Sequence, residues 1–134
     1  MASVKDAKVG DTFTLSKAVD AERSRIYGRA SGDENPIHMD ENVAKMAGLP
    51  TIILQGLCTM AFCQQTVVDW ADKNPHLLKK IKVEFRGNVL PGDTVTVNGK
   101  VTEKKDDRLV VEFQATNQKG ELVIGGGLAE VAVG

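Results

Sequence analysis

Residues 56–71 form the most apolar segment of the chain, and they limit the folds that are open to it. The segment reads Gly-Leu-Cys-Thr-Met-Ala-Phe-Cys-Gln-Gln-Thr-Val-Val-Asp-Trp-Ala, and its first half is apolar nearly all round a helix. A helix of this kind is normally enclosed by the rest of the protein rather than half exposed. We therefore expect the remaining residues to fold around it.

The sequence on both sides of this segment predicts strands. Apolar residues alternate with polar ones over a period of two, which is typical of a strand with one buried face. This pattern covers residues 11–15, 81–86, 95–97 and 109–115, and also 122–133, where Gly125, Gly126 and Gly127 interrupt it. Asn98-Gly99 is a strong hairpin signal, but a turn there would leave fragments of about five residues. We interpret it as a bulge or kink within one long strand.

The predicted fold is α+β, with an antiparallel sheet curled around one long central hydrophobic helix. The strands after the helix read as one β-meander, and residues 1–134 read as a single domain because no linker or repeat interrupts them. A helix capped by Asp20 should reach about Ala30. Residues 32–40 are rich in turn formers and predict an irregular loop, which a short helix from Glu41 to Ala47 follows.

Charge and cysteine content narrow the possible partners. Lys and Arg number 17 and Asp and Glu 18, giving a net charge of −1, so the basic surface typical of nucleic-acid binders is not expected. Cys58 and Cys63 fall in the apolar helix and are expected to be free thiols, which favours a reducing compartment. They lack further ligands nearby, so no metal site is predicted. With no membrane span or secretory signal in the sequence, we expect a cytoplasmic protein.

Asp33 and His38 lie in the predicted loop, at a spacing that regular structure does not bring together. In a helix the two side chains would be about 140° apart, and in a strand they would point to opposite faces. Pro36 disfavours a helix and makes Asn35 extended. A bent loop could bring the carboxylate and the imidazole together to bind and deprotonate a water. The same residues also fit an ordinary turn, in which Asp33 accepts backbone hydrogen bonds and His38 packs.

The residues around this pair resemble a known family signature. Residues 27–40 read Tyr-Gly-Arg-Ala-Ser-Gly-Asp-Glu-Asn-Pro-Ile-His-Met-Asp, and the likeness continues through residues 54–57 and 85–93. This pattern resembles the R-specific enoyl-CoA hydratases, also called hydratase 2 or MaoC-like proteins. The resemblance implies a single hot dog fold and a homodimer with active sites near its interface. It also implies an acyl-thioester substrate, with CoA or an acyl-carrier pantetheine as part of that substrate and no separate cofactor.

The resemblance assigns Asp33 and His38 as the catalytic pair that adds water to a trans-2-enoyl thioester, giving the (3R)-hydroxyacyl product. Negative charge develops on the thioester oxygen during the addition, and the N-terminus of the central helix could meet it. Gly56 and the N–H of Leu57 are therefore our oxyanion candidates. Asn35 is expected to hold the loop shape or to contact the substrate.

One position departs from the family pattern, because family members commonly have His where this chain has Gln55. Gln cannot take up a proton at neutral pH, so we interpret Gln55 as a scaffold or specificity change. Two alternative functions remain open: a (3R)-hydroxyacyl dehydratase acting on an acyl-carrier protein, and a non-catalytic acyl-thioester-binding subunit. A thioesterase is disfavoured, because Asp69 lies too near the end of the central helix to be its acidic residue.

Overall fold

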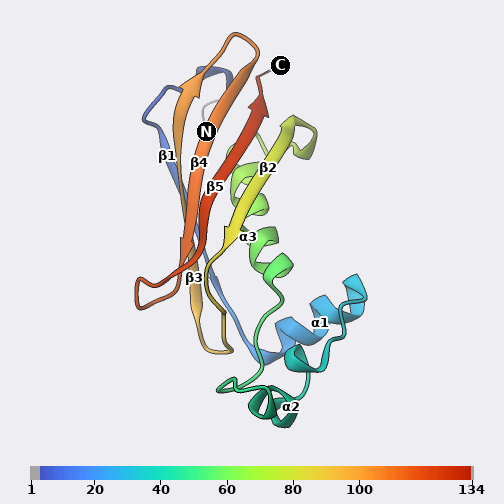
Figure 1. Cartoon of the computed structure of the whole chain (residues 1–134). Helices are drawn as coiled ribbons and strands as arrows, with labels where there is room; N and C mark the ends of the chain where they lie inside the picture. The colour runs from blue at the N-terminus through green and yellow to red at the C-terminus, as the bar shows by residue number, and fades with distance from the viewer. Residues whose placement is uncertain (1–3, 134) are drawn as a thin grey trace.

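A five-stranded antiparallel sheet curves along one side of a central helix in the computed structural model, which describes residues 4–133 (Figure 1). The helices are α1 (Ala21–Ser31), α2 (Glu41–Met46) and α3 (Gly56–Trp70), with 3-10 turns at Val4–Asp6, Pro36–His38 and Pro75–Leu77. The strands are β1 (Thr12–Ala18), β2 (Leu78–Phe85), β3 (Thr94–Lys104), β4 (Arg108–Thr116) and β5 (Leu122–Ala132). The predicted α+β architecture is confirmed.

The strand order corrects the prediction of one continuous meander. Strands β3, β4 and β5 follow each other in the sheet, but β2 pairs with β5 at the far edge, giving the order β1-β3-β4-β5-β2. The connection from β2 to β3, residues 86–93, packs against the segment that precedes α3. Val89 is buried and its carbonyl accepts the N–H of Leu54 at 2.8 Å, just before α3. Alternation along a strand predicts which face is buried, but it does not identify the neighbouring strand.

Asn98 and Gly99 lie within the continuous strand β3, so the prediction of one long strand is confirmed. No bulge occurs at these residues, because the register passes through them unbroken and shifts only between Val101 and Glu103. Gly99 instead makes room for the ring of Phe13 on β1, since a Cβ there would lie 2.2 Å from the Phe13 Cζ. Phe13 in turn stacks on Trp70 of α3, with 4.8 Å between ring centroids. The glycine therefore lets β1 pack against the end of the helix.

The sheet covers only one face of α3, which corrects the expectation of a fully enclosed helix. The side chains on the sheet side, Cys58, Phe62, Cys63 and Val67, are all buried. The opposite stripe is exposed, with Leu57 at 57% exposure and Ala61, Gln64 and Gln65 also exposed. Five strands reach round one side of a helix, so the rest of its surface is open within this chain.

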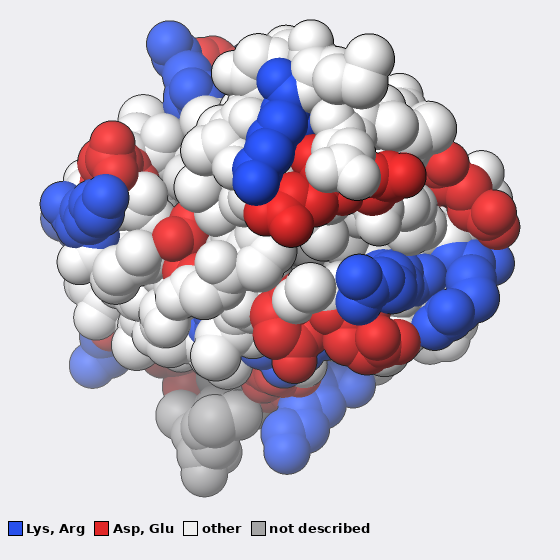
Figure 2. Space-filling model, turned by 90° about the horizontal axis from the view of Figure 1, so that it is seen from below, with Lys and Arg blue, Asp and Glu red and all other residues white. Residues whose placement is uncertain are grey.

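Helices α1 and α2 lie beyond one end of the sheet, beside the N-terminus of α3 (Figure 1). Helix α1 begins as predicted, because the Asp20 carboxylate accepts the N–H of Arg23 at 3.0 Å. The face seen from this end carries acidic and basic side chains side by side, without a field of one sign (Figure 2). Within residues 4–133, no helix is both long enough and apolar enough to cross a membrane.

Candidate active site

The loop between α1 and α2 bends sharply through a chain of local hydrogen bonds. Gly32 ends α1 in the left-handed region, at φ 83°, which favours glycine. The Ser31 hydroxyl then accepts the N–H of Asp33 at 3.2 Å, and the Asn35 side-chain oxygen accepts the N–H of Ile37 at 3.2 Å. Residues 36–38 follow as a single 3-10 turn. The loop predicted from the turn formers therefore exists, and its bend is fixed at both ends.

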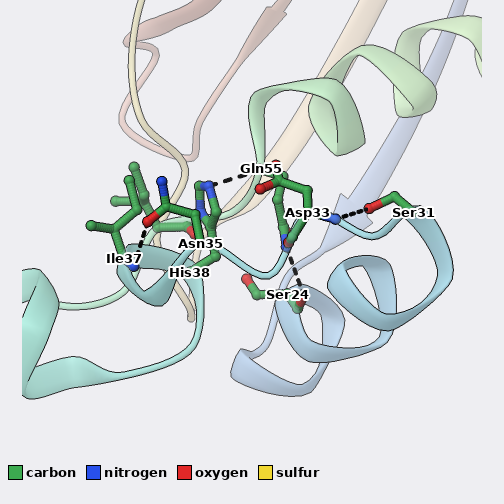
Figure 3. A network of polar contacts seen from close by, with 8 residues as sticks. Ser24, Ser31, Asp33, Asn35, Ile37, His38 and Gln55 are labelled. Atoms are coloured by element: carbon green, nitrogen blue, oxygen red, sulfur yellow. Dashed lines mark hydrogen bonds and ion pairs between the residues drawn. The ribbon is translucent and has the colours of Figure 1, made fainter.

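Asp33 and His38 converge across this bend (Figure 3). Nε2 of His38 lies 3.9 Å from Oδ2 of Asp33, and the imidazole is largely buried while the carboxylate is 43% exposed. Nδ1 of His38 lies 2.7 Å from the carbonyl oxygen of Ile53. A carbonyl can only accept, so Nδ1 is the ring nitrogen that donates. In a neutral imidazole Nε2 is then free to accept a hydrogen bond on the side of Asp33.

The N-terminus of α3 lies next to His38. The carbonyl of Gln55 accepts the N–H groups of Cys58 and Thr59, at 3.0 and 3.3 Å, so the N–H groups of Gly56 and Leu57 precede the first hydrogen bond of the helix. A cavity of about 120 Å³ opens at this point. His38, Gly56, Thr59, Phe85 and Val89 are among the residues that line it. The structure therefore brings His38 and the α3 N-terminus to one cavity, with the Asp33 carboxylate beside His38.

Phe85 limits the space around Gly56. A Cβ at residue 56 would lie 3.1 Å from Cε1 and 3.2 Å from Cδ1 of the Phe85 ring, closer than most such contacts. The ring is 54% exposed and lies at the end of β2. Glycine at the first position of α3 therefore leaves the helix N-terminus open beside an aromatic wall.

The other two predicted site residues are Asn35 and Leu57. The Asn35 oxygen is engaged in capping the 3-10 turn, so this amide shapes the loop. The Leu57 side chain is exposed on the open stripe of α3, so only its backbone N–H belongs to the helix N-terminus. Among residues 4–133, no three His, Cys, Asp or Glu side chains are grouped so that they could hold a metal ion.

Sequence reasoning missed three contributors to this region. Ile53 contributes only a backbone carbonyl, which has no side-chain signature. Tyr27 belongs to the quoted motif, but its spacing gave no sign of its surroundings. Burial raises the pKa of the Tyr27 phenol, and the nearby Cys58 and Asp33 raise this pKa further. Gly28 packs so closely that a Cβ there would lie 3.0 Å from the Asp33 carbonyl oxygen. The place of Gly28 in the same motif was the one sequence signal that could have identified it.

Comparison with known proteins adds three findings. The profile of the MaoC like domain family matches residues 5–121. The chain is 43% identical over 86 residues to the peroxisomal multifunctional enzyme type 2 of Drosophila melanogaster, covering 63% of this chain and 14% of that protein. It is 35% identical over 116 residues to the probable enoyl-CoA hydratase 2 of Dictyostelium discoideum, covering 84% of this chain and 38% of that protein. The chain thus spans well under half the length of both relatives.

Among solved structures, the (R)-hydratase from A. caviae involved in PHA biosynthesis superimposes with a TM-score of 0.86 at 23% identity. The match covers 96% of this chain and 98% of that one. At this level of identity the likeness concerns the fold, and it confirms the predicted hot dog architecture.

Proposed function

This chain belongs to the MaoC-like family, and from that premise we propose that it hydrates trans-2-enoyl thioesters to (3R)-hydroxyacyl thioesters. One observation carries the proposal: the Asp33 carboxylate and the accepting nitrogen of His38 face each other next to the cavity at the α3 N-terminus. The name of one relative points to the same chemistry, since it is called a probable enoyl-CoA hydratase 2. The substrate class is an acyl thioester carried on CoA or on a carrier pantetheine, and no separate cofactor takes part.

The pair would hold the attacking water. The 3.9 Å between Asp33 Oδ2 and His38 Nε2 is too long for a direct hydrogen bond. A single water can make hydrogen bonds of about 2.8 Å to both atoms at that separation. Both groups accept from this water, so its lone pairs remain available for attack on C3 of the enoyl group.

The N-terminus of α3 would stabilise the transition state. Attack at C3 moves negative charge onto the thioester oxygen, which needs fixed donors. The N–H groups of Gly56 and Leu57 have no helical acceptor, and the positive end of the helix dipole lies with them. Gly56 carries no side chain that would keep the thioester away from this backbone.

Hydration can be measured directly as loss of the conjugated enoyl absorbance of crotonyl-CoA and longer enoyl-CoA substrates. Steady turnover that is strongly reduced in both Asp33→Asn and His38→Ala supports the proposal. If only enoyl groups on a carrier protein react, the protein is the alternative dehydratase, with the same chemistry run on another carrier. Tight acyl-CoA binding with no turnover of either substrate would identify a non-catalytic acyl-thioester-binding subunit and reject the proposed activity.

The protein functions as a homodimer in this proposal, because two surfaces of the fold are left open. Strand β2 is an edge strand with unpaired backbone groups along one side. The exposed stripe of α3, with Leu57 and Ala61, lies on the helix face that the sheet leaves uncovered. A second copy covering both would bury this apolar surface. Sedimentation should give twice the chain mass of 14.4 kDa, and a fully active monomer at micromolar concentration would contradict the dimer.

We place this protein in the cytoplasm, because the buried free thiols of Cys58 and Cys63 suit a reducing compartment. Microscopy of the native protein in its source cells checks this placement. Concentration in peroxisomes, the compartment named for the fly relative, would overturn it.

A further inference from the structure

The side chain of Gln55 joins three segments that form the site. It is 1% exposed and stands immediately before α3, yet it does not cap that helix. Its amide nitrogen Nε2 donates to the carbonyl of Ser24 on α1 at 2.9 Å. The same nitrogen lies 3.4 Å from the backbone carbonyl of Asp33 (Figure 3). The side chain therefore reaches from the start of α3 to both α1 and the loop.

The two carbonyls match the chemistry of a carboxamide. An amide NH₂ group has two N–H donors, and each can be directed at one of the two carbonyl oxygens. The surroundings leave little freedom for adjustment, since a Cβ at Gly28 would lie 3.0 Å from the Asp33 carbonyl oxygen and 3.3 Å from Gln55 Nε2. Because α1, Asp33 and Gln55 are in close contact, a change in one of these contacts is passed to the Asp33 backbone.

Two polar atoms in this contact are poorly satisfied. Within the described residues, the Gln55 side-chain oxygen and the Ser24 hydroxyl are both buried and have no hydrogen-bond partner. Buried polar atoms without partners lower stability, so an apolar residue of similar size would suit this position better if stability alone mattered. The polar side chain of Gln55 is therefore better explained by the contacts of its nitrogen with the Ser24 and Asp33 carbonyls than by its packing.

We propose that Gln55 is a positioning residue, which fixes the Asp33 backbone relative to the N-terminus of α3 and so sets the Asp33 carboxylate against the α3 donors. The inference rests on the proposed hydration activity, in which the water and the thioester oxygen must be presented by these two elements together. In this arrangement Gln55 acts on the water and the thioester oxygen only indirectly, through the Asp33 carbonyl. Errors of about 1 Å in such an arrangement can reduce turnover by roughly a hundredfold.

Two variants separate positioning from packing. Gln55→Met keeps the length of the side chain and removes both donors, so kcat should fall about tenfold or more while KM for the enoyl thioester changes less than twofold. Gln55→Glu places a carboxyl opposite the two carbonyls. The ionised carboxylate repels the two carbonyl oxygens, whereas the protonated carboxyl can donate one hydrogen bond to them. Burial favours the protonated form.

The activity of Gln55→Glu relative to wild type should therefore rise at least threefold between pH 8 and pH 6, and that of Gln55→Met should stay flat. The titratable and charged groups near this position include Asp33 and His38 in the loop, Arg23 and Tyr27 on α1, and Cys58 on α3. All of them are present in every variant, so their ionisation largely cancels in the ratio. Loss of the buried charge would by itself relieve Gln55→Glu at pH 6, so the deciding comparison is with Gln55→Met, which is neutral at every pH and lacks the donors. In a purely packing role Gln55→Met keeps the wild-type kcat.

Amide hydrogen exchange of residues 31–38 provides a readout that does not depend on turnover. At pH 8 both variants should exchange faster there than wild type, and at pH 6 only Gln55→Glu should return to wild-type protection. Wild-type kcat in Gln55→Met, or a Gln55→Glu ratio that does not change with pH, would overturn the inference. If the wild-type protein hydrates no enoyl thioester, the proposed function fails. The positioning of the Asp33 backbone by Gln55 is then accepted or rejected on the exchange data alone.

Discussion

The two ring nitrogens of His38 are used differently: Nδ1 lies 2.7 Å from the carbonyl of Ile53, while Nε2 lies 3.9 Å from the carboxylate of Asp33. The Ile53 carbonyl fixes the orientation of the ring and directs the proton to Nδ1. Nε2 is therefore left to accept a hydrogen bond beside Asp33. This arrangement provides two acceptors for one water, and its parts can be removed one at a time.

Replacement of Asp33 by Asn keeps the size of the side chain and removes its charge. Turnover of a crotonyl or longer enoyl thioester should fall by roughly 10² or more, because an amide cannot take up the proton of the attacking water. The thermal midpoint of unfolding should change little, since the carboxylate is partly exposed. Steady-state kinetics measures the effect, and a variant within a few-fold of the wild-type kcat would reject Asp33 as the base.

Replacement of His38 by Ala should reduce kcat more than it changes KM. In the proposed mechanism the imidazole acts on the water in the transition state and not on the CoA or carrier portion of the substrate. The N–H groups at the start of α3 remain, so a slow background rate should persist. Kinetics over a range of substrate concentrations separates the two constants. A raised KM with unchanged kcat would show instead that His38 serves in ground-state binding.

Replacement of Gly56 by Ala tests the N-terminus of α3. The new Cβ would lie 3.1 Å from the Phe85 ring, so the ring must shift and the space for the thioester narrows. The N–H donors remain, but the narrowed space keeps the thioester oxygen from its best position against them, so we expect kcat/KM to fall roughly tenfold. Adding Phe85→Leu should restore part of this loss by making room. Unchanged kcat/KM in Gly56→Ala would remove this helix end from the site.

The buried thiol of Cys63 predicts weakening of the fold at alkaline pH. Burial raises the pKa of Cys63 to about 12. An unfolded cysteine has a pKa of about 8.5. The stability that depends on the neutral thiol is therefore complete below pH 8.5 and is lost as the pH rises from there towards 12. Urea unfolding under reducing conditions at pH 7.5 and 10 should show a smaller alkaline loss in Cys63→Ala than in wild type. An equal loss in both proteins would contradict the assignment.

The elements that carry a local signal were predictable from the sequence. Asp20 as a helix cap, the irregular loop around Pro36 and the long helix starting at Gly56 all depend on short-range chemistry, and the structure confirms them. The position of β2 beside β5 depends on contacts between distant residues, which alternation does not encode. The open face of α3 escaped prediction for a related reason, since an apolar helix can be covered by another chain as well as by its own.

The candidate site divides in the same way. A bent loop that could bring Asp33 and His38 together was predictable from the turn formers between them, and their assignment as a pair came from the family resemblance. The parts that hold them were not visible: the Ile53 carbonyl is a backbone atom, and Gln55 stood out only as a departure from a resemblance. Groups that act through main-chain carbonyls have no required side-chain type at the accepting residue, so no sequence pattern identifies them.

The stereochemistry of water addition follows from the position of the pair. Asp33 and His38 come from one short loop and face each other at 3.9 Å, so both must reach the same side of the bound enoyl plane. One water held between them can deliver its oxygen to C3 and return a proton to C2 from that side. This geometry predicts syn addition, and membership of the family predicts the 3R product.

Reaction in deuterated water tests both parts of this prediction. The product is coupled to an R-specific and to an S-specific 3-hydroxyacyl dehydrogenase, and only the R-specific enzyme should oxidise it. The configuration of the deuterium at C2, determined by NMR, should place it on the same face as the new hydroxyl. The residual product of His38→Ala serves as a comparison, because background addition polarised only by the α3 N-terminus has no held water to impose a face. A 3S product or anti placement of the deuterium in the wild-type reaction would mean that the water is not held between Asp33 and His38.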